Sequence, residues 1–160
     1  MPNDLKLNTV NVTAQRDPNS PGTHSGWLGI FGKADTTNVD VSFETVNLGK
    51  NTALQLHGEL QQEVVVGTVN ITGAVPENSN ASEYDTEYNA AQIETWGASW
   101  EQHNGKTGAK LRIGTLNVEA GQSVAFSSRA STGNDIGAEY YAGTAVTVGS
   151  VVMKEGSMLR

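Results

Sequence analysis

The chain has 160 residues, no cysteine, and 17 acidic against 10 basic side chains, which gives a net charge of −7 at pH 7. The acidic balance, with no cluster of Lys or Arg, argues against a nucleic-acid partner, and the lack of Cys excludes disulfides, thiolate metal sites and a Cys nucleophile. The 18 glycines and the many Thr, Val, Asn and Ser residues favour strands and turns, and no apolar run is long enough to predict a membrane span.

The first predicted strand, LKLNTVNV from Leu5, has a pattern that returns along the chain. Its apolar positions read apolar-x-apolar-x-x-apolar-x-apolar, and copies begin at Val41, Val64 and Leu111, with a looser fifth copy at Val146. Four copies contain Thr, an apolar residue and Asn in the second half. Structural equivalence of the copies is one interpretation. The alternative is that Thr-Val-Asn is simply a common sequence in β-proteins.

Alternation with a period of two predicts a strand with one buried face, and the two-residue gap in each copy reverses that alternation. We therefore expect each copy to bend, to bulge or to pass from one sheet to another; burial on both faces is the alternative. Gly67, Gly114 and Gly149 occupy the gap in three copies, where a bulge or corner favours glycine. The copies are 36, 23, 47 and 35 residues apart, and this variable spacing argues against a stacked-repeat solenoid.

Further strands are predicted between the copies, at 26–32, 51–60 and 122–130, and the second of these could form a hairpin with the copy that follows. The third comes after a turn, EAGQ. No long amphipathic helix is evident. Short strands at this spacing predict an all-β chain, folded as a single antiparallel β-sandwich or jelly roll over residues 1–153, with a C-terminal tail at 154–160.

Residues 15–26 are rich in Pro, Asn and Gly and predict an exposed loop. Residues 74–110 differ from the rest of the chain, because they combine aromatic and acidic side chains without a Lys or Arg before Lys106. Trp96 and Trp100 would share a face in either a strand or a helix. The candidates for a subunit interface or a glycan contact are Trp96, Trp100, Ile93, Tyr84 and Tyr88; burial in the core is the alternative for these rings.

Three carboxylates in the same segment, Glu83, Asp85 and Glu87, alternate along the chain and are candidate calcium ligands. Their spacing matches no EF-hand, and a solvated acidic strand face is the other interpretation. The three histidines have no metal-ligand spacing, and the chain has no phosphate-binding loop, dinucleotide fingerprint or nucleophile motif. We therefore expect no enzyme activity and no cofactor.

The C-terminal run from Asn117 to Ser157 resembles the last strands of carbohydrate-binding-module-like β-sandwiches on the surface of phage virions. The likeness lies in Ala120, Gly121 and residues 146–157, about a quarter of the chain. A second likeness, through the N-terminal strand, is to fimbrial subunits. The first resemblance implies a non-enzymatic structural protein at the virion surface, a capsid decoration or appendage module that binds a capsid or appendage protein.

The predicted assembly is a homo-oligomer, a trimer, because symmetric structural proteins pair through apolar patches. The alternative is a carbohydrate-binding module or fimbrial adhesin subunit, extracellular or on a cell surface, that binds a glycan through the same tryptophans. Neither interpretation involves nucleic acid or a membrane.

Overall fold

The computed structural model describes residues 4–14, 26–31, 40–57, 63–75, 90–96, 109–129 and 145–160, and within these ranges it contains strands and no helix. One sheet, sheet A, has the strand order β1 (Leu5–Val12), β3 (Val41–Leu48), β5 (Val64–Ile71), β7 (Lys110–Val118) and β9 (Ala145–Met153). The other, sheet B, has the order β2 (Gly26–Phe31), β4 (Thr52–His57), β6 (Ala91–Trp96), β8 (Ser123–Arg129) and β10 (Met158–Leu159).

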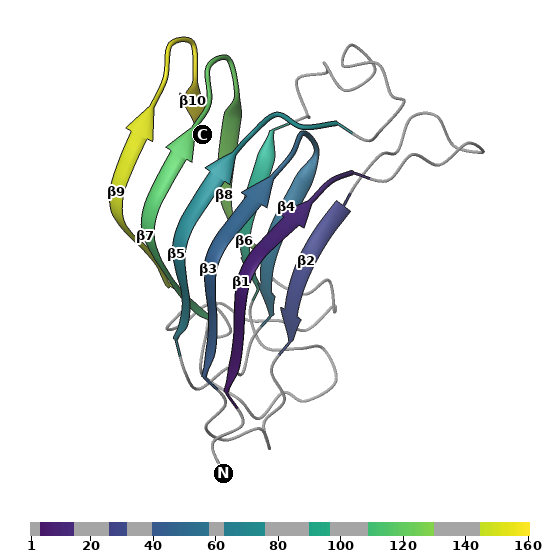
Figure 1. Cartoon of the computed structure of the whole chain (residues 1–160), viewed down its shortest axis with the longest axis vertical. Helices are drawn as coiled ribbons and strands as arrows, with labels where there is room; N and C mark the ends of the chain where they lie inside the picture. The colour runs from purple at the N-terminus through teal and green to yellow at the C-terminus, as the bar shows by residue number, and fades with distance from the viewer. Residues whose placement is uncertain are drawn as a thin grey trace, which may run out of the picture.

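The chain alternates between the two sheets, so that consecutive strands face each other across the core and every second strand pairs (Figure 1). All eight strand pairings are parallel. One strand of sheet A and the following strand of sheet B make one coil, and the first coil (β1 and β2) is followed by four more in chain order. The described chain is therefore a parallel β-solenoid, in which each coil stacks on the one before it.

The prediction of an antiparallel sandwich or jelly roll is wrong, although the prediction of an all-β chain is confirmed. Parallel strands are usually buried on both faces by helices, so alternating strands usually indicate an antiparallel sheet. In this protein the crossover between parallel neighbours runs through a strand of the opposite sheet. No helix of the described residues therefore covers the outer face, and the alternation remains. The hairpin expected between 51–60 and the next copy is also wrong, because β4 and β5 lie in different sheets.

The five copies of the repeated pattern are the five strands of sheet A, paired in matching register. Val10 pairs with Val46, and Leu116 of the fourth copy pairs with Val151 of the looser fifth copy. The structural equivalence of the copies is confirmed, and the argument against a solenoid is wrong. Stacking requires constant register within the strands, whereas the connections between them can differ in length without disturbing that register.

The core lies between the sheets and is filled by the apolar positions of the pattern. In β7 the buried residues alternate, skip two positions and alternate again, as the reversed alternation predicts. Sheet B contributes Leu54, Leu56 and Ile93 from the opposite side, all completely buried. Each coil of the middle of the solenoid therefore places side chains from both sheets in one continuous apolar core.

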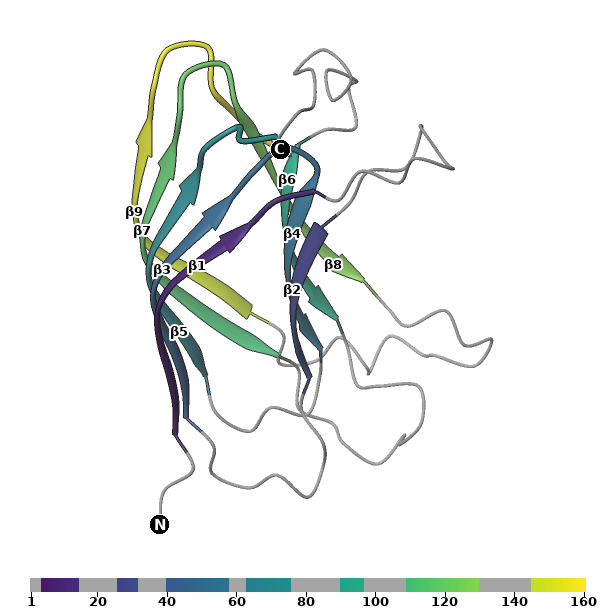
Figure 2. The same ribbon diagram turned by 45° about the vertical axis from the view of Figure 1, so that its right-hand side comes forward.

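The gap in the pattern is the place where sheet A bends, and Figure 2 shows its strands curving in mid-length. Gly67, Gly114 and Gly149 stack there in successive coils. A Cβ atom added to Gly114 would lie 2.6 Å from the carbonyl oxygen of Gly67, and one added to Gly149 would lie 2.7 Å from that of Gly114. From the third coil to the fifth, the coils thus approach more closely at the bend than a side chain allows.

The Asn of the Thr-Val-Asn sequence forms a ladder along the outer face of sheet A. Asn47 Nδ2 donates to Asn11 Oδ1 at 2.7 Å, Asn70 Nδ2 to Asn47 Oδ1 at 2.7 Å, and Asn117 Nδ2 to Asn70 Oδ1 at 2.8 Å. Identical amides can bond in this way only when parallel strands are in register, each one donating to the coil before it. The ladder explains why the sequence repeats Asn at this position.

We expect Asn70→Ala to lower the free energy of unfolding by about 1–2 kcal/mol, because it removes two side-chain hydrogen bonds from a half-buried ladder. Asn11→Ala removes one bond at an exposed end and should cost about half as much or less. Urea unfolding followed by circular dichroism measures both. Equal losses of stability for the two variants would mean that the bonds of the ladder do not each contribute to stability.

The corners that lead from sheet A to sheet B also stack from coil to coil. Gly121 and Gly156 have φ of 70°, a left-handed conformation that favours glycine, in the corners of the last two coils. The turn predicted at EAGQ is present, closed by a hydrogen bond from Gln122 N to Glu119 O. Residues 154–160, expected as a tail, form the last corner and β10, which pairs with β8.

Candidate functional site

The two ends of the described solenoid carry nearly all of its exposed large apolar side chains. Val65 on the outer face is the exception; the others lie in the first coil or the fifth: Leu5, Leu7, Trp27, Val151, Val152, Met153, Met158 and Leu159. Repeat proteins of this architecture normally cover both ends of the core with polar terminal repeats. Among the described residues these ends have no such cover, and they form two candidate interaction surfaces.

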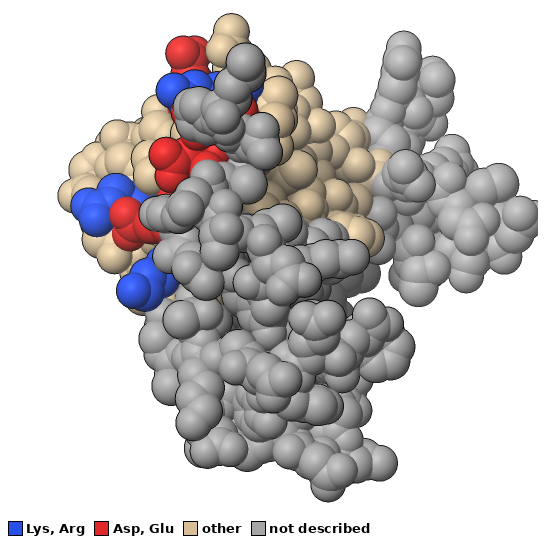
Figure 3. Space-filling view, turned by 90° about the horizontal axis from the view of Figure 1, so that it is seen from below, with Lys and Arg blue, Asp and Glu red and all other residues tan. Residues whose placement is uncertain are grey.

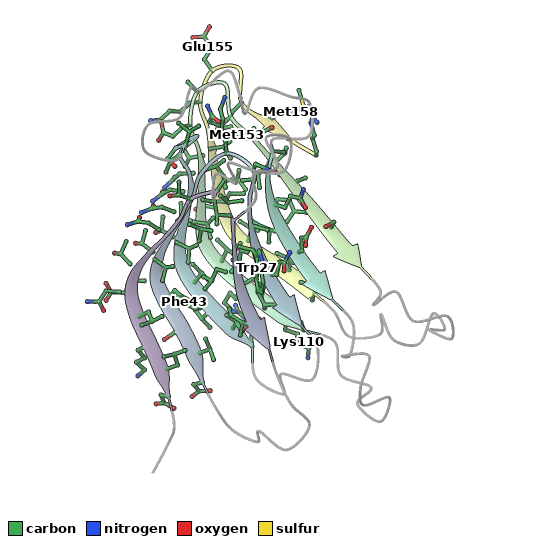
Figure 4. All side chains as sticks on the ribbon, turned by 90° about the vertical axis from the view of Figure 1, so that its right-hand side faces the viewer. Trp27, Phe43, Lys110, Met153, Glu155 and Met158 are labelled. Carbon is green, nitrogen blue, oxygen red and sulfur yellow. The ribbon has the colours of Figure 1, made fainter. Side chains whose placement is uncertain are left out.

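The first-coil end is seen face-on in Figure 4, where β1 and β2 lie nearest the viewer and Trp27 projects from β2. Leu5 and Leu7 hold the same positions in the pattern as Val41 and Phe43, which are buried in the next coil. Their side chains are nevertheless 47% and 40% exposed. The cause is position, since β1 and β2 are edge strands and no described coil stacks on them.

The fifth-coil end combines core positions with a break in the Asn ladder. Val151 and Met153 align with Leu116 and Val118 of the fourth coil. Those two residues are buried, whereas Val151 and Met153 are 44% and 41% exposed. Val152 pairs with Asn117 and stands where the other coils have Asn. It is 50% exposed, so this end presents an apolar residue on the outer face as well.

The looser fifth copy was the sequence signal for this surface, and sequence reasoning did not use it. The pattern keeps its apolar positions in β9 but replaces Thr by Ser150 and Asn by Val152. The change from Asn to Val marks this copy, but the exposure of its apolar positions depends on its place at the edge of the stack, which the sequence alone did not show.

A second feature is a polar row across the middle strands of sheet B. Gln55 pairs with Glu94, and Glu94 pairs with Ser127. Gln55 Nε2 donates to Glu94 Oε2 at 2.9 Å, and the Glu94 side chain is buried. Ser127 Oγ is buried and has no hydrogen-bond partner among the described residues. A buried carboxylate destabilises the fold unless hydrogen bonds compensate for its loss of contact with water. The bond from Gln55 provides part of that compensation for Glu94.

The residues predicted as an interface or glycan contact fall in different places. Ile93 is completely buried in the core. Trp96 ends β6, in register with His57 and Arg129 and two residues after Glu94. Trp100, Tyr84 and Tyr88 lie outside the described residues, as do the calcium candidates Glu83, Asp85 and Glu87. No group of three or more His, Asp or Glu side chains suited to a metal ion occurs within the described ranges.

Ion pairs connect neighbouring coils on the outer surface. Arg112 Nε donates to Glu63 Oε2 at 2.7 Å, and this hydrogen bond, together with the carboxylate charge, raises the pKa of Arg112 above its ordinary value. Lys154 Nζ contacts Glu119 Oε2 at 2.6 Å across the last two coils. On the face seen in Figure 3, acidic and basic side chains of the described residues lie next to one another.

Comparisons with known proteins add no relative: no family model, no curated protein and no solved structure matches this chain. The part of the chain that the structure describes contains no helix long and apolar enough to cross a membrane. The residues themselves must therefore support any functional assignment, and the two apolar ends are the most distinctive surfaces they form.

Proposed function

We propose that this protein is a non-enzymatic structural component of a virion or another surface appendage, and that it acts through protein contacts at the ends of its solenoid. The observation that carries the proposal is the concentration of exposed apolar side chains in the first and fifth coils. Large apolar surfaces on a soluble chain usually mark protein–protein contacts. The resemblance to virion-surface proteins agrees with a structural role, although the sandwich fold that it implied is wrong.

A stacked parallel solenoid suits this role because its stability is distributed along its length. Each coil bonds to its neighbours through two parallel sheets, the Asn ladder and the stacked corners, so the unit is a short stiff spacer. A stiff spacer with adhesive ends can hold other proteins at a fixed separation. The outer face of sheet A, which carries the Asn ladder and the Arg112–Glu63 ion pair, would stay in solvent.

The test is the location of the native protein in the source from which the chain comes. A specific antibody would follow the protein through density-gradient sedimentation of that material. We expect it in the particulate fractions, with virions or appendages, and released only by denaturant. Recovery solely in slowly sedimenting fractions, as a free small protein, would contradict a structural role.

The alternative of glycan binding keeps one specific observation in its favour: Trp96 lies two residues from the buried Glu94, which bonds Gln55. Sugar sites typically combine aromatic residues with amides and carboxylates. A glycan array with the wild type and the double variant Trp96→Ala, Trp100→Ala tests it. Binding that the double variant loses would favour the alternative; no binding by the wild type would remove it.

A further inference from the structure

We propose that the fifth coil of one molecule binds the first coil of a second copy of this chain, head to tail, so that the two solenoids continue as one. This inference rests on the proposed structural function and specifies its partner. Both ends expose residues that belong to core positions of the pattern. Each end therefore presents the kind of side chains that one coil buries against the next inside the protein. The surface that fits such an end is another coil.

The register of the contact follows from the pairings inside the chain. Every strand of sheet A aligns the same positions of the pattern with its neighbour. When β1 of a second copy extends the sheet beyond β9, its Leu7 lies beside Val148 and its Val10 beside Val151. Its Thr9 lies beside Ser150, whose Oγ is 3.1 Å from Thr115 Oγ1. The separation between β9 and β1 of the second copy would be one strand spacing, about 4.8 Å.

The backbone supports the same contact. Strands β1 and β9 are the two edges of sheet A, and β2 and β10 are the two edges of sheet B. Edge strands present N–H and C=O groups that can pair with another chain. Because all pairings within the chain are parallel, β1 of a second copy in the same direction would continue the hydrogen-bond pattern of sheet A along the whole of β9. In sheet B the pairing would continue only at the short strand β10, where Gly26 of the second copy aligns with Leu159.

Head-to-tail stacking accounts for both ends with one contact. A tail-to-tail dimer through two fifth coils would cover Val151 and Met153 but leave Leu5, Leu7 and Trp27 exposed. In the head-to-tail arrangement each junction covers Val151 and Met153 of one copy together with Leu5 and Leu7 of the next. The contact is heterologous and does not close, so it would produce filaments that grow along the solenoid axis.

The decisive experiment blocks one end at a time. Val151→Asp places a carboxylate on the fifth-coil end and Leu7→Asp places one on the first-coil end, at side chains that are 44% and 40% exposed. Val65→Asp is the matched control, equally exposed at 40% but on the outer face of the third coil. Light scattering and negative-stain microscopy at 0.15 M salt or above would follow assembly, since the net charge of −7 opposes it at low salt.

We expect the wild type and the control to form rods whose mass rises with concentration. Each blocked variant alone should remain monomeric, with association weakened at least about tenfold by the buried charge. A mixture of the two blocked variants should give a 1:1 dimer and nothing larger, because one free end of each kind remains. Circular dichroism establishes that the variants are folded.

A different variant keeps the test valid if an end-blocked chain does not fold. Val152→Asn restores the ladder residue at the fifth-coil end, where it can donate to Asn117 and accept from Asn11 of the next copy. Head-to-tail association should then tighten about fivefold, as one added hydrogen bond predicts. The same substitution at Val65, away from the ladder, should change nothing.

Four results would overturn the inference. The wild type could remain monomeric at every concentration, or assemble without a common axis. Leu7→Asp alone could dimerise while Val151→Asp stays monomeric, which identifies a tail-to-tail contact. Val152→Asn could weaken the association. If the chain is monomeric in isolation but sediments with particles in its source, the structural function stands and only the identity of the partner is wrong.

Discussion

Leu111→Ala should destabilise the protein by about 2–5 kcal/mol, the cost of a cavity in a close-packed core. Leu111 is completely buried between the two sheets of the fourth coil. It holds the first apolar position of the repeated pattern, with a coil on each side of it. Because each coil is stabilised mainly by its neighbours, the loss should weaken the contacts of both adjoining coils. Urea unfolding followed by circular dichroism measures the change.

Leu5→Ala is the matched control, because it removes the same atoms from the same position of the pattern in the first coil. Leu5 is 47% exposed, so its truncation should cost less than about 1 kcal/mol at concentrations too low for association. The difference between the two variants isolates the effect of stacking from that of residue type. Equal costs would mean that the first coil is as well covered as the fourth, and that the ends are not open.

The all-β class of the fold and the positions of its strands could be predicted from the sequence, because both depend on local physical chemistry. Alternating apolar residues require a strand with one buried face, and the reversed alternation at Gly67 and Gly114 requires a bend. Both predictions are confirmed. The direction of pairing could not be read from that alternation, which is the same for a parallel and an antiparallel neighbour when one face meets solvent.

The Asn residues carried the missing information. Asn47, Asn70 and Asn117 recur at one position of the pattern because in-register parallel stacking brings identical amides together. An antiparallel sheet would pair each with a different position and give no reason to repeat it. The variable spacing between copies argued against parallel stacking, but that spacing depends on the connections and not on the strands.

The candidate site was less predictable, because exposure at the ends depends on which coils are terminal. Val151 and Leu116 occupy one position of the pattern and are alike in chemistry, but one is exposed and the other buried. The aromatic residues that attracted attention lie in part outside the described ranges, and Ile93 is in the core. A structural role stays a proposal, and it now rests on the ends of the solenoid.

Gly114→Val should destabilise the protein by roughly 3 kcal/mol, toward the upper part of the range for overpacking. The new Cβ atom would lie 2.6 Å from the carbonyl oxygen of Gly67, well inside the separation that two such atoms tolerate. That oxygen belongs to the backbone of the neighbouring strand, so no side chain can rotate away to relieve the contact. Two strands of sheet A would have to separate at the bend, which strains the pairings on both sides.

Glu44→Val separates this steric effect from the change in β-propensity. Glu44 is the exposed gap residue of the second copy, so a side chain is already accommodated at that level of the bend. Its replacement should change the free energy of unfolding by less than about 0.5 kcal/mol. If Gly114→Val is tolerated as well as Glu44→Val, the coils are not held in close contact at the bend. The glycines would then serve the backbone conformation of the bend and not the approach of one coil to the next.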